Sequence, residues 1–175
     1  MDTWKQFEAN ELTHSAAHHL LAIHEVGLQY GGWARVSDIA RELQITRGSV
    51  SINLRALKKR GLVEADAHRL VKLTPEGLQA AKAVMATRAV LKTFFADVLG
   101  VPDIQADIDS CKIEHLISHA TAERLALFQR FLTSDPDAMQ QLLARFQRFH
   151  AECPHDRSCD VCKGHCPVDG LPHAI

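Results

Sequence analysis

Two short helical stretches joined by a tight turn constrain the fold of this chain more than any other feature. Residues 35–62 read RVSDIARELQITRGSVSINLRALKKRGL. Apolar residues at helical spacing after Ser37, a favoured N-cap residue, predict a first helix over 37–44. Thr46 has the same N-cap chemistry for a second helix, and Gly61 is a typical stop. The segment therefore predicts a helix-turn-helix.

The flanking residues extend this motif on both sides. An amphipathic pattern over 11–29 predicts a preceding helix that ends at the glycines of GGW. After Gly61, the β-rich pieces LVEA and LVKLT flank a short polar loop, which is the pattern of a hairpin. We expect a mainly α fold that begins with a winged helix-turn-helix domain.

Basic residues are concentrated in this region although the whole chain is almost neutral. Residues 32–75 hold nine Lys/Arg against four Asp/Glu, in a chain whose formal net charge is −1. Because a second helix of this kind enters the DNA major groove with its first turns facing base edges, we predict double-stranded DNA as the partner. The candidate DNA-binding residues are Ser37, Thr46, Arg47, Ser49, Ser51, Asn53, Arg55, Lys58, Lys59, Arg60 and Arg69.

The second half of the chain reads as helical throughout. Thr74 as N-cap and Pro75 in the first turn start a helix that we expect to reach about Leu99, and its apolar content favours a buried or self-associating helix. Three more helices are expected over 103–118, 121–133 and 136–150. We predict a winged-helix domain over 1–75, an all-helical dimerisation and metal-binding domain over 76–150, and a Cys-rich tail over 151–175.

One of these helices carries potential metal ligands. Cys111, Glu114 and His115 occur at i, i+3 and i+4, so their side chains would share one helix face and could converge on one ion. A small buried Cys beside a solvated Glu and a His bound to a backbone carbonyl explains the triplet equally well.

The two motifs together resemble the diphtheria-toxin-repressor family of iron- and manganese-dependent transcription regulators. ARVSDIARELQITRGSVSINLRALKKRGLVEADAHRLVKLTPEG is similar to its winged-helix signature and CKIEHLIS to its Cys-x-x-Glu-His metal-binding helix, within a likeness over residues 12–133. The resemblance implies a homodimeric, Fe- or Mn-dependent DNA-binding regulator that represses metal-uptake genes. It also implies a first-helix ligand, which is His18 here, or His19 after a one-residue slip.

The sequence departs from the family at a second, ancillary metal site. Arg88 and Lys92 match the positions that supply its ligands, and charged Arg and Lys cannot bind a cation, so we expect this site to be absent. The remaining set of His18, Cys111, Glu114 and His115 suits Fe(II), Mn(II), Co(II) or Zn(II) and is poor for Ca²⁺ or Mg²⁺.

Four cysteines follow the last predicted helix, with the spacing Cys153-x5-Cys159-x2-Cys162-x3-Cys166-Pro. Cysteines so close together in a cytosolic chain favour a bound metal over bridges. The spacing favours a 4Fe–4S cluster over zinc, and His155 and His165 keep a mixed Cys/His zinc site open. The rival hypothesis for function is therefore a redox or iron–sulfur-sensing regulator that is switched by this tail.

The sequence argues against other classes of protein. The N-terminus has no leader pattern, and no stretch approaches the roughly 20 apolar residues that span a bilayer, so we expect a cytoplasmic protein without membrane contact. Neither a Gly-rich phosphate loop nor a GxSxG elbow is present. Cys111 and His115 as nucleophile and base would lie on one helix without an oxyanion loop, so we expect no enzyme.

Overall fold

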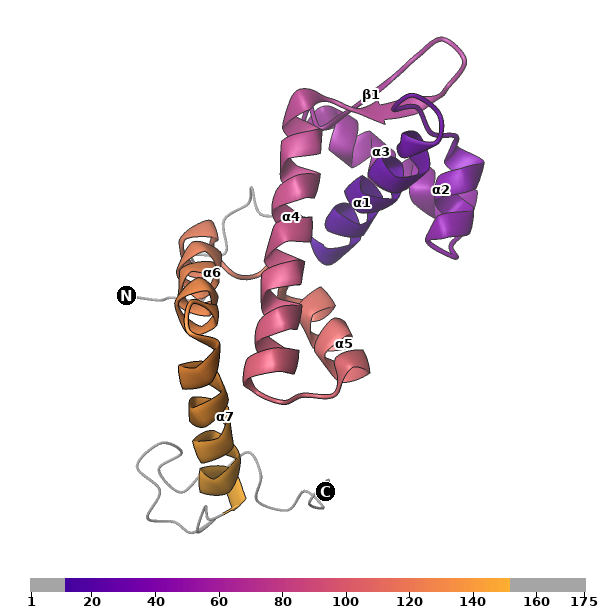
Figure 1. Cartoon of the computed structure of the whole chain (residues 1–175). Coiled ribbons are helices and arrows are strands. Elements are labelled where there is room, and N and C mark those ends of the chain that lie inside the picture. The colour runs from indigo at the N-terminus through magenta and orange to yellow at the C-terminus, as the bar shows by residue number, and fades with distance from the viewer. Residues whose placement is uncertain (1–11, 152–175) are drawn as a thin grey trace, which may run out of the picture. The chain divides into compact units, whose positions relative to one another are not determined.

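The computed structural model describes residues 12–151, and most of them are helical (Figure 1). The elements are α1 His14–Leu28, α2 Val36–Glu42, α3 Arg47–Lys59, β1 Val63–Ala65, β2 Val71–Leu73, α4 Pro75–Thr93, the π-helix η2 Phe94–Val98, α5 Asp103–Ile113, α6 His119–Thr133 and α7 Pro136–Ala151. The expected mainly α fold with a winged helix-turn-helix is confirmed. Within the described range, no helix combines the length and apolar character needed to cross a membrane.

Local capping explains where the helices of the helix-turn-helix start and stop. The Thr46 side chain accepts a hydrogen bond from the Ser49 amide at the start of α3, as predicted. Gly61 follows the helix with φ +71°, a conformation that glycine adopts without strain. The predicted Ser37 cap is wrong, because α2 begins at Val36 after an extended Arg35 that makes no side-chain cap. The Ser37 hydroxyl instead donates to the Asp38 carboxylate at 3.4 Å.

The wing is a two-stranded antiparallel hairpin in which Glu64 faces Lys72 across the strands. These two side chains form an ion pair at 2.8 Å. At the tip, the Asp66 carboxylate accepts hydrogen bonds from two backbone amides of the loop, at 2.8 and 2.9 Å. An isolated bridge from Ala34 to Val71 ties the wing to the segment before α2, a contact that the sequence did not reveal.

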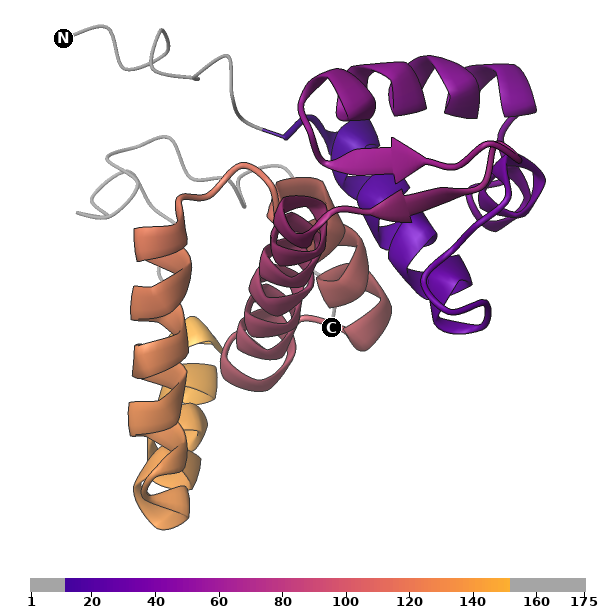
Figure 2. The same ribbon diagram turned by 90° about the horizontal axis from the view of Figure 1, so that it is seen from above.

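The helices α1, α2 and α3 and the hairpin enclose one apolar core, and Figure 2 shows the two strands beside α3. The largest fully buried apolar side chains are Leu20, Ile23, Ile39, Val50, Leu57 and Val71. The helix α1 packs on both α3 and α4, so it connects the recognition helix to the long helix that follows the hairpin. The position of α3 therefore depends on the position of α1.

The helix α4 starts as predicted, with the Thr74 side chain accepting from the Gly77 amide and Pro75 in the first turn. The helical run ends at Val98 with Leu99 as its C-cap, close to the expected end, but residues Phe94–Val98 form the π-helix η2 and not α-helix. The aromatic side chain of Phe94 packs against Phe128 of α6 with ring centroids 6.4 Å apart.

The chain divides into two compact units, residues 1–129 and residues 130–175. The first unit holds the winged helix, α4, α5 and most of α6, and the second contains the end of α6 and α7. The predicted domain boundaries at residues 75 and 150 stay predictions. The predicted tail site at Cys153, Cys159, Cys162 and Cys166 lies outside the described residues.

The start of α4 generates a test of the fold. A Cβ atom added to Gly77 would lie 1.9 Å from the Leu62 carbonyl oxygen, so Gly77→Ala must push α4 away from the hairpin. We expect a loss of about 2 kcal/mol or more in the free energy of unfolding, measured by urea denaturation.

The matched control is Gly48→Ala in α3, where the added Cβ would meet only the Thr46 hydroxyl at 3.7 Å. Alanine favours a helix by about 1 kcal/mol over glycine, so this variant should be as stable as the parent or more so. Equal losses in the two variants would contradict the close contact of α4 with Leu62.

Candidate metal centre and nucleic-acid interface

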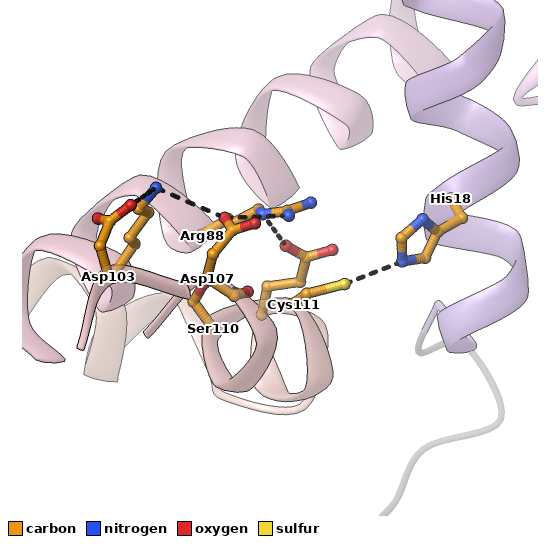
Figure 3. A network of polar contacts seen from close by, with 8 residues as sticks. His18, Arg88, Asp103, Asp107, Ser110 and Cys111 are labelled. Atoms are coloured by element: carbon orange, nitrogen blue, oxygen red, sulfur yellow. Dashed lines mark hydrogen bonds and ion pairs between the residues drawn. The ribbon is translucent and has the colours of Figure 1, made fainter. Parts of the chain in front are cut away.

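A histidine of α1 meets a cysteine of α5 although the two residues are 93 positions apart. The His18 Nε2 and Cys111 Sγ atoms lie 3.2 Å apart, and Figure 3 shows the two side chains pointing toward each other from the two helices. Both residues are partly buried. An imidazole nitrogen and a thiol sulfur at this separation can bind the same metal ion.

His14 joins this pair, and sequence reasoning missed it. One ligand atom each from His14, His18 and Cys111 lies within 4.8 Å of the other two. The His14 ring centroid is 4.4 Å from that of His18 and 5.1 Å from that of His115. The four-residue spacing of His14 and His18 on a helix was the signal that could have found it.

Cys111, Glu114 and His115 were predicted to share one face of a single helix, but the three residues do not all lie in a regular helix. The helix α5 ends at Ile113, so only Cys111 lies within it, while Glu114 caps the helix and His115 lies in the turn that follows. Neither Glu114 nor His115 belongs to the described cluster of ligand atoms around Cys111. Both nevertheless keep buried donor atoms without a hydrogen-bond partner: the two Glu114 carboxylate oxygens and His115 Nδ1.

Two cations hold the acidic residues beside this site (Figure 3). The Arg88 guanidinium contacts Asp107 at 3.2 Å and Glu114 at 3.8 Å. Lys92 contacts Asp103 at 3.4 Å and Asp107 at 3.8 Å. These ion pairs link α4 to α5, and the absence of a second metal site at Arg88 and Lys92 stays a prediction.

His19 is oriented differently from its neighbour. Its side chain is buried, and its Nδ1 atom lies 2.6 Å from the Ser15 carbonyl oxygen of the same helix. The described geometry therefore puts His18, and not His19, beside Cys111.

The helix α3 buries Val50, Leu54 and Leu57 and exposes a polar face. Three of the candidate DNA-binding residues on that face are hydrogen-bonded to the helix itself: Ser51 donates to the Arg47 carbonyl, Asn53 to the Ser49 carbonyl and Arg55 to the Ser51 carbonyl. Thr46 and Ser49 share the N-terminal cap. Among the described contacts, the side chains of Arg47, Lys58 and Lys59 make no hydrogen bond or ion pair, so they are available to a partner.

Arg69 lies at the tip of the wing, where its backbone adopts φ +62° and its side chain is exposed. Its amide donates to the Asp66 carbonyl oxygen at 3.2 Å. The hairpin therefore presents this guanidinium group away from the core, while Ser37 is half-buried at the start of α2.

Comparison with known proteins gives two family matches that divide the chain. Residues 11–70 match the model of the MarR family, and residues 74–143 match the model described as the iron dependent repressor, metal binding and dimerisation domain. The chain is 34% identical over 113 residues to the HTH-type transcriptional regulator MntR of Listeria welshimeri, which covers 65% of this chain and 79% of that regulator. The chain belongs to the MntR family of transcriptional regulators.

Solved structures show the same fold. The crystal structure of IdeR from T. acidophilum is 26% identical, with a TM-score of 0.53, and the match covers 66% of this chain and 53% of that chain. The manganese regulator SloR is 21% identical, with a TM-score of 0.59 and coverage of 66% of this chain and 54% of that chain. This member of the MntR family is a metal-responsive DNA-binding regulator, and its family is one of transcriptional regulators that dimerise.

Burial sets the protonation of the potential ligands in this MntR-family chain. Desolvation lowers the pKa of His18 and of His115, and the neighbouring His14 lowers both further. Their rings are therefore neutral at pH 7 and keep a lone pair for a metal. Desolvation and the nearby Glu114 carboxylate raise the pKa of the Cys111 thiol, so metal binding there must release a proton. Neutral imidazoles, a thiol and carboxylate oxygens without hydrogen bonds fit a divalent metal ion.

The buried Glu114 generates a prediction for the metal-free protein. Desolvation raises the pKa of this carboxyl group to about 7, although Arg88 acts in the opposite direction. The folded state therefore keeps a proton that the unfolded chain loses near pH 4.5, so the free energy of unfolding should fall as the pH rises from about 4.5 to 7.

The shift corresponds to a loss of up to about 3 kcal/mol over this pH range, which chemical denaturation at several pH values can measure. Glu114→Gln removes the ionisable group and should flatten this part of the profile. A parent profile with the same slope as the variant would show that Glu114 titrates normally.

Proposed function

We propose that this chain is a repressor of metal-uptake genes that binds its operator when Fe(II) or Mn(II) is held by His18, Cys111, Glu114 and His115. The 3.2 Å approach of His18 on α1 to Cys111 on α5 carries this proposal. His14 supplies a further donor to the same site. A bound ion would supply a positive charge, and His18 on α1 and Cys111 on α5 are the residues that would hold it.

The residues of α1 provide the route from this site to DNA. Ser15, beside His14, donates a hydrogen bond to Asn53 in the recognition helix α3 at 3.1 Å. Apolar side chains of the same helix pack in the core with Val50 and Leu57. When His18 and Cys111 are held together, α1 loses freedom relative to α5, and α3 is held with it. A coupling of about 1 to 3 kcal/mol would change operator affinity roughly 5- to 150-fold.

Binding to double-stranded DNA would use the exposed face of α3 and the wing. Arg47 lies in the first turn, where side chains reach base edges, whereas Lys58 and Lys59 lie in the last turn and suit phosphates. Arg60 and Arg69 extend the basic surface beyond the helix. Ser37, Thr46, Ser49, Ser51, Asn53 and Arg55 stay candidates for closer contacts.

A homodimer would place two such helices on one operator. Helix α5 leaves Ile104 and Ile108 exposed one turn apart, at 78% and 44%. Leu127 and Phe128 of α6 are also exposed. Apolar side chains of this size on one unit favour burial against a second copy.

The cysteine tail and the cellular location are proposals from sequence alone. We propose that Cys153, Cys159, Cys162 and Cys166 hold a 4Fe–4S cluster or zinc, and that the regulator acts in the cytoplasm without catalytic activity. The family matches end at residue 143, so the spacing of the four cysteines is the support for the tail site.

The metal switch can be tested by operator binding with and without metal. His18→Ala should abolish the stimulation of DNA binding by Fe(II) or Mn(II), because α1 then loses the nitrogen that lies 3.2 Å from Cys111 Sγ. Fluorescence anisotropy with an operator selected from random DNA measures this stimulation.

His24→Ala, on the same helix but outside the ligand cluster, is the matched control and should respond like the parent. A normal response of the His18 variant would exclude this switch, provided that circular dichroism shows unchanged helical content.

The two ends of α3 should contribute differently to DNA binding. Arg47→Ala should weaken binding to the selected operator by about 1 to 3 kcal/mol and relax its sequence preference. Lys59→Ala should weaken binding to operator and to random DNA alike. Equal losses on both DNAs for the two variants would refute this division of roles.

The proposed homodimer predicts a shift to monomers when charge is placed on α5. The double variant Ile104→Asp and Ile108→Asp should have about half of the parent mass in light scattering after gel filtration. Ile52→Asp, at an exposed position in α3, is the control and should keep the parent mass. An unchanged mass for the α5 variant would exclude this face from the dimer contact.

A further inference from the structure

We propose that the site between α1 and α5 selects a metal ion that binds sulfur and nitrogen, such as Fe(II), Co(II) or Zn(II), and discriminates against Mn(II). This inference rests on the proposed metal site and specifies which metal ions the site prefers. The structure gathers one thiol and two imidazoles, His14, His18 and Cys111, within 4.8 Å of one another. No carboxylate belongs to that described cluster.

The donor atoms determine this preference. Thiolate binds soft and borderline ions, and imidazole suits zinc, iron, copper and nickel. Carboxylate, carbonyl and water oxygens suit manganese and magnesium. A set of two nitrogens and one sulfur therefore gains most from Zn(II), Co(II) and Fe(II), and it gives Mn(II) few of the oxygen ligands that it favours.

The distances are compatible with a small tetrahedral site. With bonds of about 2.1 Å to nitrogen and 2.3 Å to sulfur, tetrahedral ligand atoms lie roughly 3.5 Å apart. The His18 Nε2 and Cys111 Sγ atoms are 3.2 Å apart already. His115 follows Cys111 closely in the chain, and its buried Nδ1 atom has no hydrogen-bond partner, so it can supply a fourth ligand.

The neighbouring carboxylates are engaged by fixed cations. Arg88 pairs with both Asp107 and Glu114, and Lys92 pairs with Asp103 and Asp107. An oxygen-rich site for Mn(II) would have to separate these ion pairs and bring a divalent ion close to the Arg88 guanidinium. Binding through His14, His18 and Cys111 separates none of these ion pairs, although the Cys111 thiol must give up its proton to solvent as the metal–sulfur bond forms.

Cobalt(II) provides the test because its spectrum reports both sulfur ligation and geometry. The full chain with Cys153, Cys159, Cys162 and Cys166 changed to Ser leaves Cys111 as its one thiol. Titration with Co(II) should give a sulfur-to-cobalt charge-transfer band and strong visible bands of a four-coordinate ion. Both should disappear when Cys111→Ser is added.

Competition between metals tests the selectivity itself. Nitrogen and oxygen sites generally bind Mn(II) more weakly than Co(II), so the informative quantity is the change in the ratio of the two affinities. Cys111→Asp replaces sulfur by oxygen and should lower this ratio by about tenfold or more, which is at least about 1.4 kcal/mol. His24→Asp, outside the cluster, should leave the ratio unchanged.

The outcomes separate the two proposals. Failure of the parent to bind any of these metals between α1 and α5 would overturn the proposed site together with this inference. Metal binding without a charge-transfer band, or with an unchanged ratio in Cys111→Asp, would overturn the selectivity alone. Fe(II) under anaerobic conditions and Zn(II) are then tested separately for stimulation of DNA binding, which identifies the ion that activates the regulator. Stimulation by Mn(II) at the same low concentration as Fe(II) or Zn(II) would contradict the inference.

Discussion

The contact between His18 and Cys111 is the interaction on which the proposed switch depends. It joins two helices that are far apart in the sequence, and one of them, α1, also supplies core residues to the winged helix. A restraint on α1 is therefore transmitted by close packing rather than by a flexible linker. The hydrogen bond from Ser15 to Asn53 adds a polar connection between the same helix and α3.

The charges around this contact favour a state that responds to a cation. The Glu114 carboxylate is buried without hydrogen bonds, and the Arg88 guanidinium that pairs with it also pairs with Asp107. A buried carboxylate that is poorly neutralised destabilises the folded protein, and a bound divalent ion would offset part of this destabilisation. Arg88 and Lys92 form ion pairs with the acidic side chains of α5, so they reduce the number of oxygen donors left for a second ion.

Much of the fold could be predicted from sequence because local chemistry determines it. Thr46, Thr74 and Gly61 have unambiguous capping roles, and two β-rich pieces on either side of a short polar loop indicated the hairpin. The N-cap predicted at Ser37 was wrong because Ser37 lies one position inside α2, and this helix starts without a side-chain cap. The end of α5 and the π-helix were missed because both depend on packing between distant segments, which a helical period does not encode.

Only some of the candidate metal ligands could be predicted from the sequence. The spacing of Cys111, Glu114 and His115 indicated metal chemistry, but His18 came from family resemblance, and His14 emerged from the fold because only three-dimensional proximity relates it to Cys111. The alternative between His18 and His19 could not be decided from their adjacent positions. The orientation of the two rings distinguishes them, since His19 turns to the Ser15 carbonyl.

Hydrogen–deuterium exchange with and without metal tests the central claim most directly, because it reads α1 and α5 separately and needs no operator. The account predicts that metal slows amide exchange in both α1 and α5, and that Cys111→Ser removes the protection in both helices. Protection that is confined to one helix, or that persists in the Cys111 variant, would contradict the claim that a shared metal ion joins them.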